Sequence, residues 1–210
     1  YSPISGMLWP MVESYVSGGR TGKSLRSAIG RFNVVWSSSL VFSMLVMSPF
    51  AEEQPLGVLT ALACVHVVSA VMLPWFAPFP ARHEHGTHVS HPPVYAKLLT
   101  FVQMLLPIAF MFVSALAPFL PSATRFLGLK PEHGPLLAAA WMAARVVTFF
   151  TLERWDGWHG RWWTPMLGVA ALLGGFAITV LTPRLLSGQS VALPLVIFGL
   201  TVFGLGVGII

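Results

Sequence analysis

Long apolar runs separated by short polar gaps constrain the fold of this chain more than any other feature. Each approaches the roughly 20 residues that a helix needs to cross a hydrocarbon core of about 30 Å. The runs are continuous rather than alternating with polar residues, which favours helices over barrel strands. The sequence therefore predicts an all-α polytopic membrane protein. We expect about seven transmembrane helices, at residues 1–16, 33–50, 56–78, 95–120, 134–152, 164–182 and 190–210.

Charge content excludes an ordinary soluble domain. Only 9 % of the residues are charged, whereas about a quarter are charged in soluble domains. The net charge of +5 comes from basic residues scattered singly between apolar runs, not from a patch with interleaved aromatics, so we expect no nucleic-acid partner. The single cysteine, Cys64, lies within an apolar run and rules out an internal disulfide framework. The lipid bilayer is the expected partner.

Basic residues alternate between the loops and predict the membrane topology. Loops 17–32, 79–97 and 153–163 carry eight Lys or Arg residues, while the other three loops carry three basic and three acidic residues. The positive-inside rule then makes those first three loops cytoplasmic. We expect a multi-pass protein of the cell (inner) membrane. The chain begins and ends inside apolar segments without an initiator methionine, which suggests an internal piece of a longer protein.

A polar stretch from Pro80 to Pro93 interrupts the apolar sequence and is rich in histidine. Imidazoles are common metal ligands, so this stretch is a weak candidate site for zinc or copper. No cysteine joins it, and no helical or strand pattern would preorganise ligands, so we expect a solvated connecting loop without metal or other cofactor. Its four histidines are His83, His85, His88 and His91.

Arg145 is the most informative single residue. It lies near the middle of the segment 134–152, where an arginine costs at least about 2.5–3.5 kcal/mol on insertion scales. Glu153 on the same helix is about 12 Å away along the axis, at 1.5 Å per residue. The partner is therefore on another helix, a backbone carbonyl or an anionic substrate. A structural tether and a role in a transport path remain equal alternatives.

Other polar residues recur at helical spacing and are candidates for a substrate path or for ion coupling. Trp9 and Glu13 share one face of the first segment, although an ion pair of Glu13 with Arg20 or with a neighbour is the favoured interpretation. Gln103 and Ser114 belong to a polar stripe on the fourth segment, as expected of a helix that lines an aqueous cavity. Asn33, Ser37 and Ser48 give the second segment a small polar surface suited to close packing. Gly204 and Gly208 form a G-x-x-x-G pattern that favours packing against another helix.

The loop between the fifth and sixth segments combines charge, glycine and tryptophan. Its sequence, Glu153-Arg-Trp-Asp-Gly-Trp-His-Gly-Arg-Trp-Trp163, contains Arg154, Asp156 and Arg161. Asp156 and Arg161 can form charge-assisted bonds to helix ends. We expect this cytoplasmic loop to act in gating, by biasing a conformational equilibrium.

These features together resemble the major facilitator superfamily of secondary transporters. The layout of short alternating loops, the basic loop leading through Gly30-Arg-Phe-Asn-Val-Val-Trp-Ser37 into a span, and the longer central loop are similar to that family. Asp156 to Arg161 is a loose match to its D-R-x-G-R motif, with the glycine and arginine one residue late. The G-P-x-x-G motif of drug antiporters is missing from 33–50, which makes a drug antiporter less favoured.

The resemblance implies a domain organisation and a function. The seven segments would match spans four to ten of a twelve-helix fold. Residues 1–79 would then end an N-terminal half, 80–93 would be the cytoplasmic linker, and 94–210 would begin the C-terminal half. The first, fourth and seventh segments would line a central cavity, and the second and fifth would meet between the halves. The implied function is secondary active transport of a small solute by alternating access, with a proton or cation as a possible coupling ion.

Two alternatives from other classes remain. A transporter-like protein that acts as a sensor or assembly factor without transport would have its cavity closed by bulky apolar residues. A metal-binding membrane protein would use the histidine-rich loop. We do not expect an enzyme.

Overall fold

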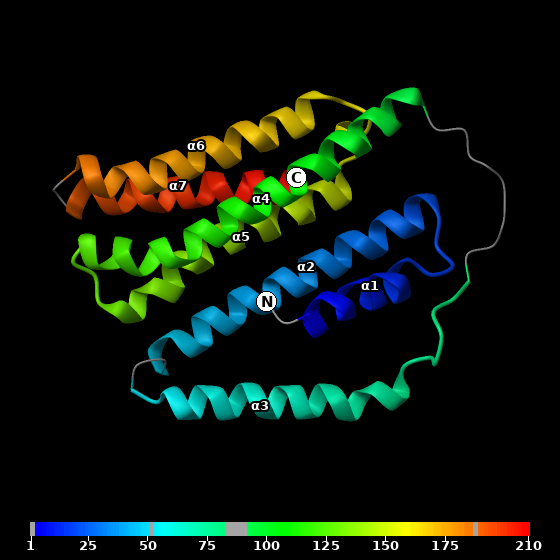
Figure 1. Ribbon diagram of the computed structural model, residues 1–210, viewed down its shortest axis with the longest axis horizontal. Helices are drawn as coiled ribbons and strands as arrows, with labels where there is room; N and C mark the ends of the chain where they lie inside the picture. The colour runs from blue at the N-terminus through cyan, green and yellow to red at the C-terminus, as the bar shows by residue number, and fades with distance from the viewer. Residues whose placement is uncertain (1–2, 51–52, 83–91, 187–188) are drawn as a thin grey trace.

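The computed structural model describes residues 3–50, 53–82, 92–186 and 189–210, and this part of the chain is helical without strands. It contains seven α-helices and four short 3₁₀ segments (Figure 1). The prediction of an all-α protein is therefore confirmed for these residues. The helices are α1 (Pro3–Ser17), α2 (Gly22–Met47), α3 (Pro55–Met72), α4 (Pro93–Phe126), α5 (Gly134–Arg154), α6 (Trp163–Leu185) and α7 (Gln189–Ile209).

Six of the seven helices are long and apolar enough to cross a membrane: α2 through α7. The first segment forms α1, whose 15 residues are shorter than the roughly 20 that a span requires. The protein is therefore a multi-pass membrane protein by helix length and composition. The described residues therefore contain six candidate spans, one fewer than the expected number of about seven.

Three helices differ from the predicted segments by several residues at one end: α2, α4 and α3, which ends at Met72 rather than near residue 78. α2 begins at Gly22, well before the predicted start at 33, because its first turns carry charged residues that the apolar pattern does not detect. α4 continues to Phe126 with Pro118 and Pro121 inside it. It ends with Gly128 at φ 62°, where Leu129 N–H donates to Thr124 O at 2.9 Å. This closure is a Schellman motif, which favours glycine.

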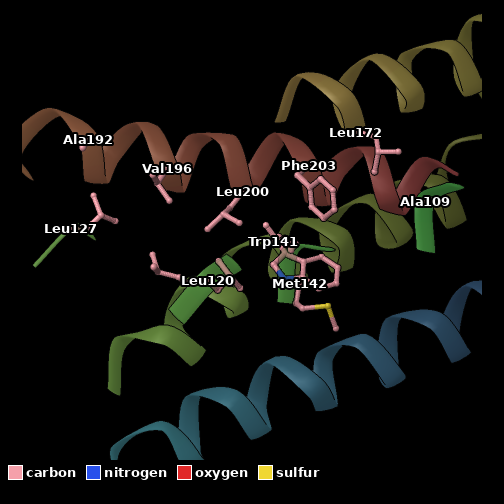
Figure 2. Close-up of a cluster of buried hydrophobic side chains, with 12 residues drawn as sticks. Ala109, Leu120, Leu127, Trp141, Met142, Leu172, Ala192, Val196, Leu200 and Phe203 are labelled. Carbon is pink, nitrogen blue, oxygen red and sulfur yellow. The ribbon is translucent and has the colours of Figure 1, made fainter. Parts of the chain in front are cut away.

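Helices α4 to α7 enclose the main apolar core. α6 and α7 share the most extensive contact, and α7 also packs along α5. Figure 2 shows Trp141 of α5 close to Phe203 of α7, with ring centroids 5.8 Å apart. The buried members of this core include Leu116, Leu120, Trp141, Met142, Leu172, Val196, Leu200 and Phe203.

Glycines permit the close helix contacts. A Cβ on Gly204 would overlap Trp141 O, and one on Gly208 would lie 2.7 Å from Thr148 Cβ. The predicted G-x-x-x-G packing is thus confirmed, with α5 as the partner helix. Small residues allow backbones in membrane helices to approach and gain van der Waals contact.

The N-terminal helices α1, α2 and α3 meet the other four chiefly through the pair α2 and α5. α3 stands apart along the edge of the molecule (Figure 1). No residue of α3 is buried, and its surface is mostly apolar, with Val65, Val68 and Met72 all exposed. A helix that is apolar all round suits contact with lipid.

Candidate functional site

The contact between α2 and α5 is the candidate functional site, and we call it the α2–α5 seam. The two helices run antiparallel: Gly30 lies against Glu153, Trp36 against Arg145, and Ser48 donates a hydrogen bond to Glu132 O just before α5. Ser37 and Ser48 are both buried, so the predicted close packing of the second segment is confirmed. The resemblance also implied contact between these two segments, and they do pack together.

Glu153 is the centre of a charge cluster at one end of the seam. Its side chain is only 13 % exposed, and Oε1 accepts a hydrogen bond from Ser27 Oγ at 3.2 Å. Oε1 also lies 3.6 Å from Arg31 Nε, while Oε2 lies 3.4 Å from Arg154 Nη1. A carboxylate held by several donors from two helices ties the helices together at this end.

Gly30 makes room for this carboxylate. A Cβ at Gly30 would lie 2.7 Å from Glu153 Cγ, closer than van der Waals contact allows. Any larger residue at this position would therefore displace the Glu153 side chain from its partners.

A second ion pair extends the cluster to the loop after α5. Arg26 Nη2 lies 2.7 Å from Asp156 Oδ1, and Arg26 Nη1 lies 3.5 Å from His159 Nε2. His159 Nδ1 is 3.1 Å from Asp156 O, and its ring stacks on Trp158. The charge cluster therefore joins the beginning of α2 to both α5 and the following loop. We define it as Arg26, Ser27, Arg31, Glu153, Arg154, Asp156 and His159.

Arg145 lies halfway along the seam, between aromatic rings. Its Cζ is 4.9 Å from the centroid of the Trp36 ring on α2 and 5.0 Å from that of Phe149 on α5. These are cation–π contacts, which stabilise the charge from the ring faces. The Nε atom is buried without a hydrogen-bond partner, and no carboxylate of the described residues pairs with the guanidinium.

Ser37 supplies a second buried polar atom without a partner at the same level of the seam. Its residue is fully buried, and Oγ makes no hydrogen bond among the described residues. Other hydroxyls in these helices donate to the carbonyl four residues earlier, as Ser39 does to Val35 O at 2.9 Å and Thr179 to Gly175 O at 2.8 Å. The antiparallel register places Ser37 opposite Arg145.

A pocket of about 570 Å³ lies toward the other end of the seam, between α2, α4 and α5. Its walls are apolar except for Thr124 and Arg125, and Arg125 is exposed. Met44 and Ser37 are seven residues apart on α2, and Ala138 and Arg145 are seven apart on α5, so each pair shares a helix face. The lining residues are Met44, Val113, Leu116, Ala117, Leu120, Pro121, Thr124, Arg125, Gly134, Pro135, Ala138 and Trp141.

The residues predicted on the first two segments fall beside the seam. Trp9 packs against Phe32 and Trp36, with centroids 5.7 and 5.4 Å apart, and so supports the ring that contacts Arg145. Asn33 is half-buried on α2. The favoured ion pair between Glu13 and Arg20 is wrong: Arg20 donates to Val16 O instead, and the exposed Glu13 makes no ion pair within the described chain.

The polar stripe of α4 does not line the pocket. Gln103 and Ser114 are both exposed, and the pocket uses another face with Val113, Leu116 and Leu120. At 100° per residue, these three residues lie roughly 100–160° around the helix from Ser114. The structure therefore does not bring Gln103 or Ser114 to Arg145.

The predicted gating loop is only partly assembled in the charge cluster. Asp156 pairs with Arg26 of α2 rather than with a helix end. Arg154 contacts Glu153 and lies over Phe150, 3.5 Å from the ring centroid. Arg161 is exposed, and its side chain bonds no residue in the described ranges.

The histidine-rich stretch falls outside the described residues, which exclude His83, His85, His88 and His91. Among the residues that are described, no group of three or more metal-ligating side chains comes together. His66 and Cys64 are exposed on α3.

Sequence reasoning missed the charge cluster and the pocket. The signal for the cluster was present: loop 17–32 supplies arginines and loop 153–163 supplies Glu153 and Asp156. Both loops were predicted on the same membrane side, next to segments that were predicted to meet. The pocket gave no sequence signal, because its lining is ordinary apolar sequence from three separate helices.

Comparison with protein-family models, characterised proteins and solved structures gave no match.

Proposed function

We propose that this chain supplies spans four to ten of a secondary transporter of the major facilitator superfamily, which moves a small solute by alternating access. One observation carries the proposal: the α2–α5 seam is tied by ion pairs at one end, whereas toward the other end it borders an apolar pocket. Such asymmetry is what one state of an alternating-access cycle requires.

The proposed mechanism uses the charge cluster as a reversible closure. In this state Arg26, Asp156 and Glu153 hold the beginning of α2 against the end of α5. Arg26 and Asp156 are both partly exposed, and ion pairs between such groups contribute little each, so this pair can break and reform without a large barrier. Loss of these ion pairs would let the two halves rock about the middle of the seam, where Arg145 lies.

The proposed topology places the charge cluster in the cytoplasm. It contains residues from loops 17–32 and 153–163, both of which carry arginine residues, and Lys and Arg residues are in excess in cytoplasmic loops. The pocket would then face the opposite side of a cell (inner) membrane. The solute, with a coupling proton or cation, would enter there.

Reconstitution tests this function. The protein expressed from its complete reading frame is placed in proteoliposomes, and charge movement is recorded for panels of organic acids, amino acids, sugars and organic cations. We expect a saturable current for at least one class, lost in Arg145→Gln and retained in Arg184→Gln. Binding of a solute without any flux would contradict transport and favour a sensor.

A further inference from the structure

We propose that Arg145 and Ser37 form the polar end of a binding site for a small monocarboxylate with an apolar body. The inference rests on the proposed transport function, because it names the substrate class that the seam would accept. It depends on three observations: an unpaired cation, an unpaired hydroxyl and an apolar pocket on the same helix faces.

The unpaired cation indicates the charge of the ligand. Every acidic residue of the described chain is engaged elsewhere or lies free at the surface. Glu153 and Asp156 bind the arginines of the charge cluster, and Glu132 pairs with Lys130. The ring faces of Trp36 and Phe149 stabilise the Arg145 charge, but they leave its buried Nε–H group without a hydrogen-bond acceptor. An anion with two coplanar oxygens would supply that acceptor.

The unpaired hydroxyl indicates a ligand atom close to α2. A buried hydroxyl without a partner costs about 1–3 kcal/mol, and Ser37 forgoes the carbonyl bond that Ser39 makes two residues later. An oxygen held by Arg145 across the seam would accept a hydrogen bond from Ser37. Both buried orphan atoms of the described chain, Ser37 Oγ and Arg145 Nε, would then be satisfied by one group.

The pocket indicates the rest of the ligand. Its volume of about 570 Å³ lies in the range of small-molecule sites, roughly 300–1,000 Å³. Trp141 and Met44 in its wall lie one and two helical turns from Arg145 and Ser37 respectively, roughly 6 and 10 Å along the axes. An aryl or alkyl group would fill this space, while its carboxylate reached the seam.

The pocket lining excludes other ligand classes by its chemistry. No acidic residue lines it, so an organic cation would find no counter-charge. A sugar needs several polar partners, and the lining offers only the side chains of Thr124 and Arg125. The Thr124 hydroxyl already donates to Pro121 O at 2.8 Å. Arg125, at the outer part of the pocket, would attract anions toward it.

Calorimetric binding to the purified, detergent-solubilised protein tests the site. The probes are benzoate, 4-phenylbutyrate and decanoate, each compared with its uncharged primary amide. The variants are Arg145→Gln, Arg145→Lys and Ser37→Ala, and Arg184→Gln, on the exposed end of α6, is the matched control. Folding of each variant is checked by its elution profile and its melting temperature.

We expect at least one carboxylate to bind at least tenfold more tightly than its amide. Arg145→Gln should lose that difference, Arg145→Lys should retain part of it, and Ser37→Ala should weaken carboxylate binding several-fold. Arg184→Gln should bind as the parent protein does. If Arg145→Gln does not fold, the Ser37→Ala and Arg145→Lys affinities decide the question.

Equal binding of acid and amide, unchanged affinity in the Arg145 and Ser37 variants, or no binding of any probe would overturn the inference. The binding assay is independent of flux. Carboxylate binding that depends on Arg145, in a protein that moves no solute, would support this site and contradict transport. Flux of a sugar or a cation that does not depend on Arg145 would support transport and contradict this carboxylate site.

Discussion

Glu153 is the residue on which the charged end of the seam depends most. It is nearly enclosed, yet it accepts contacts from Ser27, Arg31 and Arg154. A carboxylate in this position contributes only while its partners remain in place. Its removal would leave the half-buried Ser27 hydroxyl and two arginines without their acceptor.

We therefore predict that Glu153→Ala destabilises the folded protein. Hydrogen bonds to charged groups contribute about 1.5–3 kcal/mol, and the partly exposed arginines reduce the total, so we expect a loss of about 1–2 kcal/mol. Unfolding in mixed micelles with increasing dodecyl sulfate measures it. Glu53→Ala, at an exposed site without an ion pair, is the control, and equal effects of the two changes would argue against the cluster.

For single residues, the sequence identified important side chains more successfully than it identified their partners. Arg145 could be selected because an arginine in an apolar segment is costly, and its contact with Trp36 needed the fold. The expected ion pair of Glu13 with Arg20 is wrong, because Arg20 reaches a carbonyl of its own helix end instead. Local spacing cannot distinguish these outcomes, since both partners lie within reach.

At the scale of elements, the contact between α6 and α7 depends on glycine. Gly175 faces α7, and a Cβ there would overlap Phe203 N and lie 2.7 Å from Gly199 O. Its neighbour Gly174 has nothing within 4 Å of such a Cβ. The two adjacent glycines therefore offer a matched pair on one helix.

We predict that Gly175→Ala destabilises the protein and that Gly174→Ala does not. Overpacking costs about 1–3 kcal/mol, because the two backbones must separate, whereas alanine on an exposed helical face is tolerated. Melting temperatures of the two variants in the same detergent measure the difference. A Gly175→Ala variant as stable as Gly174→Ala would contradict the described α6–α7 contact.

The sequence predicted the helices themselves more completely than the contacts between them. The apolar runs predicted all seven helices, because membrane spans need long apolar segments. The start of α2 was missed because Lys23, Arg26 and Arg31 continue the helix as a polar extension. The prediction of which face of α4 lines a cavity was also wrong. Gln103 suggested a polar wall, but the pocket that α4 borders has mostly apolar walls. Periodicity reports polarity around a helix, and the neighbouring helices decide which side is enclosed.

At the scale of the whole molecule, the arrangement predicts which loops share a membrane side. Residues 23 and 161 lie at the end with the charge cluster, and residue 130 lies beyond α4 at the other end. In a Cys64→Ala background, we expect single cysteines at Lys23 and Arg161 to be protected from an impermeant maleimide in intact cells. A cysteine at Lys130 should be labelled. Labelling of all three positions alike would contradict the topology.

The central claim is that the α2–α5 seam opens alternately at its two ends. In nanodiscs, electron–electron resonance would measure distances between spin labels at positions 23 and 161, by the charge cluster, and at positions 50 and 126, by the pocket. We predict two populations at each end, changing in opposite directions, with Asp156→Asn shifting the first pair to the longer distance. A single distance at each end, unchanged by Asp156→Asn, would contradict alternating access through this seam.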